Sequence, residues 1–93
     1  MAAIHEKTAR YEQLLSEALA AAEIAVPPET PLWEAATDCK EMARSYLEDG
    51  RHFQEQADLV NALAAFSYGH AWLDAAARIG LLAVPREGHL FTV

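Results

Sequence analysis

The sequence is poor in the residues on which several classes of protein depend. Cys39 is the only cysteine, so the chain can form neither an internal disulfide nor a thiolate cluster for zinc. Basic residues number 7 against 14 acidic ones, which gives a net charge of −7. A basic surface for nucleic-acid phosphates is therefore not expected. No apolar run approaches the roughly 18 residues of a membrane-spanning helix, so we expect no membrane partner.

The length and composition favour one small folded domain. At 93 residues the chain is long enough for a single core. Apolar residues make up 53% of it, and although 20 residues are alanine, enough larger side chains remain to exclude disorder. The N-terminal segment is charged and has no apolar region of the kind found in secretory signals, so we expect a cytoplasmic protein.

Helical periodicity dominates the chain, and no stretch shows a useful strand alternation. Apolar residues recur at helical spacing in three segments, residues 3–25, 31–54 and 59–79. A proline and a glycine interrupt the pattern in residues 83–93, which predicts an extended tail. Short connections make successive helices antiparallel neighbours. The sequence therefore predicts an all-α fold, an up-down three-helix bundle with an extended C-terminal tail.

Capping signals lie at the ends of these segments. Pro27 and the proline after it stop the first helix, because proline cannot donate a backbone hydrogen bond. Thr30 and Asp58 are suitable N-caps for the second and third helices. Gly80 is a suitable residue to follow the end of the third helix.

A helical hairpin between the second and third segments predicts which residues face each other. If the chain reverses at residues 56–58, facing positions add up to about 115, which places Tyr46 against Gly69. Gly50 lies inside the second helix, where glycine costs about 1 kcal/mol relative to alanine. It indicates either close packing at this point or a tolerated substitution.

The second half of the chain carries a distinctive residue pattern. It consists of Tyr46-Leu47-Glu48-Asp49-Gly50-Arg51-His52-Phe53, Ala57-Asp58-Leu59-Val60-Asn61-Ala62, Tyr68-Gly69-His70-Ala71-Trp72-Leu73-Asp74-Ala75 and Gly80-Leu81-Leu82, together with the ending Phe91-Thr92-Val93. Over about residues 40–93 the pattern resembles a small archaeal family called domain of unknown function 357. The resemblance implies an archaeal source and a small helical bundle. It implies no activity, so no catalytic residue is carried over from it.

A few positions depart from the pattern of that family. Gly50 stands where alanine is expected, and Ala57 stands where a turn glycine is expected. Gly69 and Ala71 are exchanged relative to the usual order of small residues. These departures affect the packing details that the resemblance implies.

Four polar or aromatic residues are candidates for a site between the second and third helices. Asp49 and His70 are expected about one turn apart, and Tyr46 and Tyr68 are near enough to join them. One interpretation is a small-ligand or proton-handling pocket, since a histidine beside a carboxylate titrates near neutral pH. The other is a structural hydrogen-bonded pair that fixes the register of the hairpin.

Other kinds of site have less support in the sequence. Cys39 falls on the apolar face of its helix, where a buried thiol is inert. The carboxylates and histidines do not converge at one level, as a di-metal site in a bundle requires. We therefore assign no catalytic residue, no metal site and no cofactor, and we expect a non-enzyme rather than an enzyme.

An apolar flank of the third helix is a candidate interface. Tyr68, Trp72 and Ile79 lie beyond the arc that two neighbouring helices need to cover. They form a partner surface, for which Trp and Tyr are favoured anchors, or else the first helix or the tail covers them. Leu90 and Phe91 in the tail either bind a partner or fold back onto the bundle.

The sequence thus predicts a protein-interaction or self-association module, with a second copy or another protein as its partner. The alternative function is a small-ligand-binding protein or minimal enzyme that uses the pocket between Asp49 and His70. Nucleic acid is not an expected partner, because the charge balance opposes it.

Overall fold

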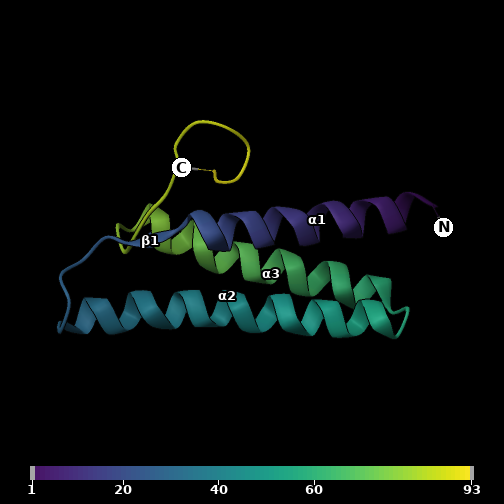
Figure 1. Ribbon diagram of the computed structural model, residues 1–93, viewed down its shortest axis with the longest axis horizontal. Helices are drawn as coiled ribbons and strands as arrows, with labels where there is room; N and C mark the ends of the chain where they lie inside the picture. The colour runs from purple at the N-terminus through teal and green to yellow at the C-terminus, as the bar shows by residue number, and fades with distance from the viewer. Residues whose placement is uncertain (1, 93) are drawn as a thin grey trace.

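The structure, a computed structural model, describes residues 2–92 and consists mainly of three long helices that lie side by side (Figure 1). Helix α1 spans Ala2–Ala21, α2 spans Pro31–Glu55 and α3 spans Leu59–Arg78. Helix α3 lies between the other two and contacts both, whereas α1 and α2 contact each other little. The molecule is elongated and flattened, with extents of 45 × 25 × 16 Å. The predicted all-α, three-helix architecture is confirmed.

Side-chain caps begin the second and third helices as predicted. The Thr30 hydroxyl accepts a hydrogen bond from the Trp33 N–H at 3.2 Å and donates one to the Pro27 carbonyl at 2.8 Å. The Asp58 carboxylate accepts from the Asn61 N–H at 3.3 Å. Each cap satisfies a backbone donor that a helix N-terminus leaves without an internal partner.

The first helix is shorter than predicted, and a small sheet takes its place. Helix α1 ends at Ala21, after which Glu23–Ile24 form strand β1. This strand pairs antiparallel with strand β2, Leu82–Ala83, and the Ala25 N–H donates to the Leu81 carbonyl at 2.9 Å. The alanine-rich pattern continues into these residues, but pairing with the segment after α3 satisfies their backbone groups outside the helix. The predicted tail accordingly begins within a strand.

Two glycines bring α2 and α3 into close contact. A Cβ atom at Gly50 would lie 2.6 Å from Phe66 Cδ1, and one at Gly69 would lie 3.0 Å from Tyr46 Cβ. Tyr46 therefore faces Gly69, which is the hairpin register predicted from the sequence. Of the two interpretations of Gly50, close packing is correct, because a larger residue would overlap the buried ring of Phe66.

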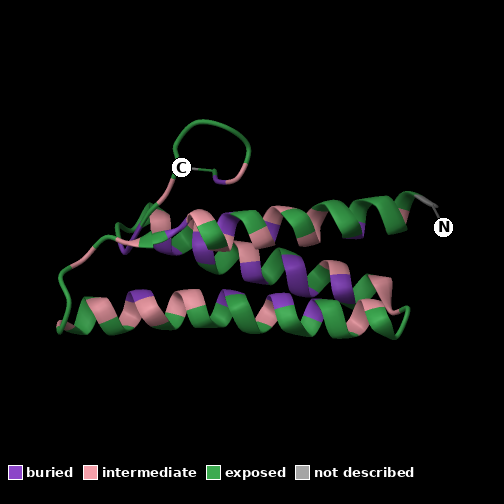
Figure 2. Cartoon of the chain, viewed as in Figure 1, coloured by how far each residue is buried: buried purple, intermediate pink, exposed green. Residues whose placement is uncertain are grey.

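The core lies around α3. Buried residues occupy much of α3 and the sides of α1 and α2 that face it (Figure 2). The cluster consists of Leu15, Ala18, Ala22, Ala36, Ala43, Leu47, Ala62, Phe66, Leu73, Ala76, Leu81, Leu82 and Phe91. After β2 the chain loops outward and returns to the bundle, which brings Phe91 into this core (Figure 1). Within residues 2–92, none of the helices combines the length and apolar character that a bilayer crossing demands.

Candidate functional site

The four residues predicted to form one pocket are divided between two places. Tyr46 and Tyr68 have ring centroids 5.8 Å apart. Together with Asp49 they line a shallow hollow of about 200 Å³ where α2 packs on α3. His70 lines a different hollow beneath the tail. The predicted contact between Asp49 and His70 is not formed, because positions 68 and 70 of a helix lie about 200° apart around its axis.

His70 belongs to a row of polar side chains along α3 that holds the backbone of the tail. Its Nδ1 lies 3.0 Å from one oxygen of Asp74, and its Nε2 lies 2.5 Å from the Leu90 carbonyl oxygen. The other oxygen of Asp74 accepts the Thr92 N–H at 3.1 Å, and Arg78 donates to the Thr92 carbonyl at 2.6 Å. The three side chains stand four residues apart and thus lie on one side of the helix. We call His70, Asp74 and Arg78 the tail clamp.

Both partners of the His70 ring in the tail clamp are oxygen atoms. A carbonyl oxygen and a carboxylate oxygen can only accept hydrogen bonds. Both contacts are therefore satisfied together only when both ring nitrogens carry protons. The side chains of His70 and Asp74 that meet here are only 15% and 21% exposed. This arrangement binds an extended segment through its main chain and leaves neither ring nitrogen free for acid–base chemistry.

The tail residues predicted as a candidate interface fold back onto the bundle. Phe91 is 8% exposed, and its ring centroid lies 5.8 Å from that of His70. Leu90 is partly buried and packs against the core cluster. Both side chains are thus occupied by contacts within the chain, which is the fold-back alternative of the sequence analysis.

The aromatic flank of α3, in contrast, remains exposed within residues 2–92. Tyr68 is 62% exposed, Trp72 39% and Ile79 73%, and Val60 at the start of the helix is 69% exposed. Neither α1 nor the tail covers this flank, although the sequence allowed either of them to do so. With three exposed alanines these residues form a continuous stripe, the open face of α3, which consists of Val60, Ala64, Tyr68, Ala71, Trp72, Ala75 and Ile79.

The open face is apolar and slightly hollowed. Tyr68, Ala71, Trp72 and Ala75 surround a shallow depression of about 240 Å³. Sequence reasoning missed Val60 and the alanines as parts of this surface. Their spacing of three or four residues was the available signal, but alanine is common both in cores and on helix surfaces.

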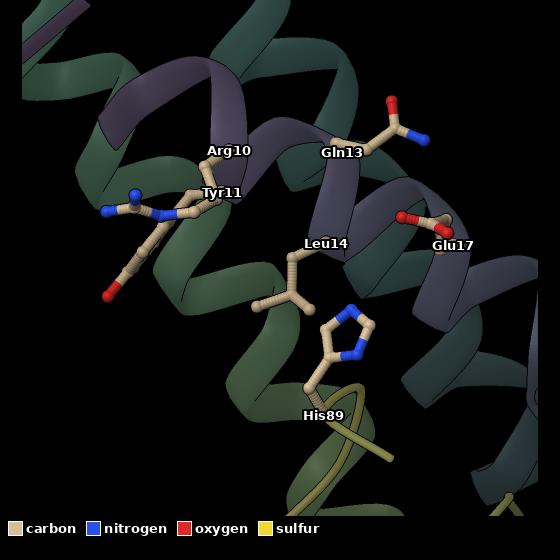
Figure 3. A pocket seen from close by; sticks show the side chains of 6 residues that line it. All are labelled: Arg10, Tyr11, Gln13, Leu14, Glu17 and His89. Carbon is tan, nitrogen blue, oxygen red and sulfur yellow. The ribbon is translucent and has the colours of Figure 1, made fainter. Parts of the chain in front are cut away.

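Another hollow, of about 420 Å³, lies between α1 and the tail (Figure 3). Its lining residues are Arg10, Tyr11, Gln13, Leu14, Glu17 and His89. Leu14 points toward His89, whereas Arg10 and Gln13 point to opposite sides (Figure 3). Polar groups in a ligand site converge on one region, and these do not. In the part of the chain that the structure describes, no group of three or more His, Cys, Asp or Glu residues could hold a metal ion.

The single cysteine has the properties of a structural thiol. Cys39 is partly buried and packs against the core cluster. Burial, and to a smaller extent the Asp38 carboxylate, raise the pKa of its thiol above the ordinary value of 9.0. The thiolate is the nucleophilic form of cysteine, so this environment disfavours nucleophilic chemistry at neutral pH.

Comparison with known proteins identifies a family. A family model with the description "Protein of unknown function (DUF357)" matches residues 10–82. The match includes most of α1, whose sequence alone is generic, and it leaves out the Phe-Thr-Val ending that the predicted resemblance included. No curated protein and no solved structure matches the chain. Because the family model covers well over half of the residues, the chain belongs to the DUF357 family of proteins of unknown function.

Proposed function

We propose that this chain is a protein-interaction module whose binding surface is the open face of α3. The observation that carries the proposal is the exposure of Tyr68, Trp72 and Ile79 on one side of one helix. Single exposed apolar residues are ordinary on protein surfaces, but a contiguous row of them marks an interaction site. Trp and Tyr are also the residues that most often dominate the binding energy of interfaces.

The charge distribution supports this function. The chain carries a net charge of −7, yet the open face contains no charged residue. Depletion of charge is typical of the buried centre of an interface. The long, narrow shape of the face suits the apolar side of another α-helix as its ligand. A cytoplasmic location is part of the proposal, since a chain with one cysteine does not depend on an oxidising compartment.

The alternative function from the sequence, a ligand pocket or minimal active site between Asp49 and His70, is not proposed. His70 is held by Asp74 and the Leu90 carbonyl, away from Asp49. The two residues line different hollows.

Substitution of the most enclosed aromatic residue of the face tests the proposal. We expect Trp72→Glu to lose every protein that the tagged wild-type chain captures through the open face, including other copies of itself. Leu32→Glu is the matched control, because Leu32 is 55% exposed but lies on α2. Each protein lost only with Trp72→Glu is then produced and titrated against the purified chain. If Trp72→Glu retains the same set of proteins as the wild type, the open face is not the binding surface.

A further inference from the structure

We infer that the partner of the open face is a second copy of this chain, which docks through its own open face with the two α3 helices antiparallel. The inference rests on the function proposed above and names the partner of the same surface. It is carried by the residue spacing, the residue sizes and the charges along α3.

The spacing of residues along the open face reads the same in both directions. Apart from Trp72, which lies beside the row, its members are separated by 4, 4, 3, 4 and 4 positions in the order Val60, Ala64, Tyr68, Ala71, Ala75 and Ile79. A two-fold axis between Tyr68 and Ala71 therefore places each of these six residues opposite another of the six in the second copy. In that register Ala64 lies opposite Ala75 and Val60 lies opposite Ile79. An interface of two identical patches requires this kind of self-complementarity.

Residue sizes match in the same register. Tyr68 of one copy lies opposite Ala71 of the other, at the depression bordered by Tyr68, Ala71, Trp72 and Ala75. The large side chain of Tyr68 thus fits the depression above Ala71, and the two-fold axis produces the same contact a second time. The pairing of Ala64 with Ala75 on either side allows the helix axes to approach to about 8 Å.

The charges of α3 favour the antiparallel orientation. Asp58 caps its first turn, and Arg78, which also donates to the Thr92 carbonyl, lies in its last turn. Between them the helix has one further acidic residue, Asp74, which is bound to His70 and the tail. An antiparallel pair brings Asp58 of one copy within about one helical turn of Arg78 of the other. A parallel pair would place like charges and like helix dipoles together.

The spacing also predicts how the helices cross. Members that lie opposite one another over the whole length from Val60 to Ile79 require a small crossing angle, of the class of about 20°. Contact therefore extends along the helix from Val60 to Ile79. Trp72 lies beside the row of six residues, opposite Ser67 of the second copy.

Disulfide cross-linking tests the register and orientation directly. Two chains are prepared in a Cys39→Ala background, one with Ala64→Cys and one, labelled with ¹⁵N, with Ala75→Cys. The antiparallel register places positions 64 and 75 at one level, within the Cα separation of about 7 Å that a disulfide tolerates. Two copies of position 64 are instead separated by about 16 Å along the axis. We expect labelled–unlabelled dimers from the mixture and almost none from either chain alone. Dimers from each chain alone would show parallel pairing and overturn the inference.

Sedimentation equilibrium tests whether the second copy binds at all. We expect a dimer for the wild type, an unchanged dissociation constant for Leu32→Glu and at least a tenfold weaker dimer for Ile79→Glu. Ile79 is 73% exposed, so its substitution leaves the core intact, which circular dichroism checks. A wild-type monomer at every concentration overturns the inference. If the wild type is a monomer but captures another protein that Trp72→Glu does not, the proposed function stands. If Trp72→Glu captures everything that the monomeric wild type captures, both the inference and the proposed function fail.

Discussion

At the scale of single residues, the backbone of Ala57 determines the turn between α2 and α3. Its φ of 59° lies in the left-handed region, which explains why the family resemblance placed a glycine there. The Cβ of alanine destabilises the folded state by about 1–2 kcal/mol in this region. Glycine avoids this strain but destabilises the folded state by about 0.5–1 kcal/mol, because it has more conformational freedom in the unfolded chain. The strain energy of alanine at position 57 is therefore slightly larger than its advantage over glycine in conformational entropy.

We expect Ala57→Gly to raise the free energy of unfolding by about 0.5 kcal/mol. Urea denaturation followed by circular dichroism measures the change. Ala9→Gly is the control, because Ala9 is an exposed residue inside α1, where glycine should lower stability by about 1 kcal/mol. A loss of stability at position 57 similar to that at position 9 would contradict the strain argument.

The thiol of Cys39 makes the stability of the chain depend on pH. Burial, followed by the charge of Asp38, raises the pKa of its thiol in the folded chain. The folded state therefore holds this proton more tightly than the unfolded state does. The contribution to stability is fully present below the unfolded pKa of 9.0 and is lost as the pH rises through the folded pKa.

Iodoacetamide alkylation measured against pH checks this prediction, since only the thiolate reacts. We expect the midpoint of the rate profile to lie at higher pH for the folded chain than for the chain in urea. Asp38→Asn should move the folded midpoint part of the way back, because burial remains. Coincident midpoints for folded and unfolded chains would show that the environment of Cys39 does not disfavour its charge.

At the scale of elements, the tail is an appendage of α3 held by a few hydrogen bonds. Asp74 uses both carboxylate oxygens, one for His70 and one for the Thr92 N–H. Asp74→Ala is expected to release the tail, accelerate exchange of the Thr92 amide at least tenfold and lower stability by about 1–2 kcal/mol. Hydrogen exchange followed by NMR measures this effect, and Glu55→Ala is the control, because Glu55 is exposed and lies 4.0 Å from His52. A protected Thr92 amide in Asp74→Ala would mean that other contacts hold the tail.

The helical hairpin was predictable because its information is local. Caps at Thr30 and Asp58 and a short turn fix the register of α2 and α3, and that register correctly placed Tyr46 against Gly69. The pairing of β1 with β2 was not predictable, because two-residue strands show no alternation and their partners are distant in the sequence. The end of α1 was misplaced for the same reason.

The candidate site shows a different limit of sequence reasoning. A hairpin register gives the level of a residue along the axis, and on that basis Asp49 and His70 were placed together. Orientation around the axis decides contact, and it directs His70 toward the tail. The open face was predicted in part, through Tyr68, Trp72 and Ile79. Whether the open face is covered depends on the positions of α1 and the tail, and the periodicity of α3 gives no information about these positions.

At the scale of the whole molecule, the flattened shape produces the open face. A central helix packed between two flanking helices has a third side, and neither α1 nor α2 reaches it in the described residues. The tail covers another part of α3, along the row of His70, Asp74 and Arg78. The remaining apolar side is thus a consequence of the architecture, and pairing of two molecules would supply the missing layer.

The net charge of the molecule predicts how such pairing responds to salt. Each copy carries a charge of −7, so dimerisation brings two strongly acidic molecules together, although the contact surface itself is uncharged. Added salt screens the repulsion between the copies without weakening apolar burial. We expect the dimer to tighten several-fold between about 0.05 and 0.5 M NaCl, as measured by sedimentation equilibrium at pH 7. Weakening over this range would show that ionic contacts, rather than the open face of α3, hold the copies together.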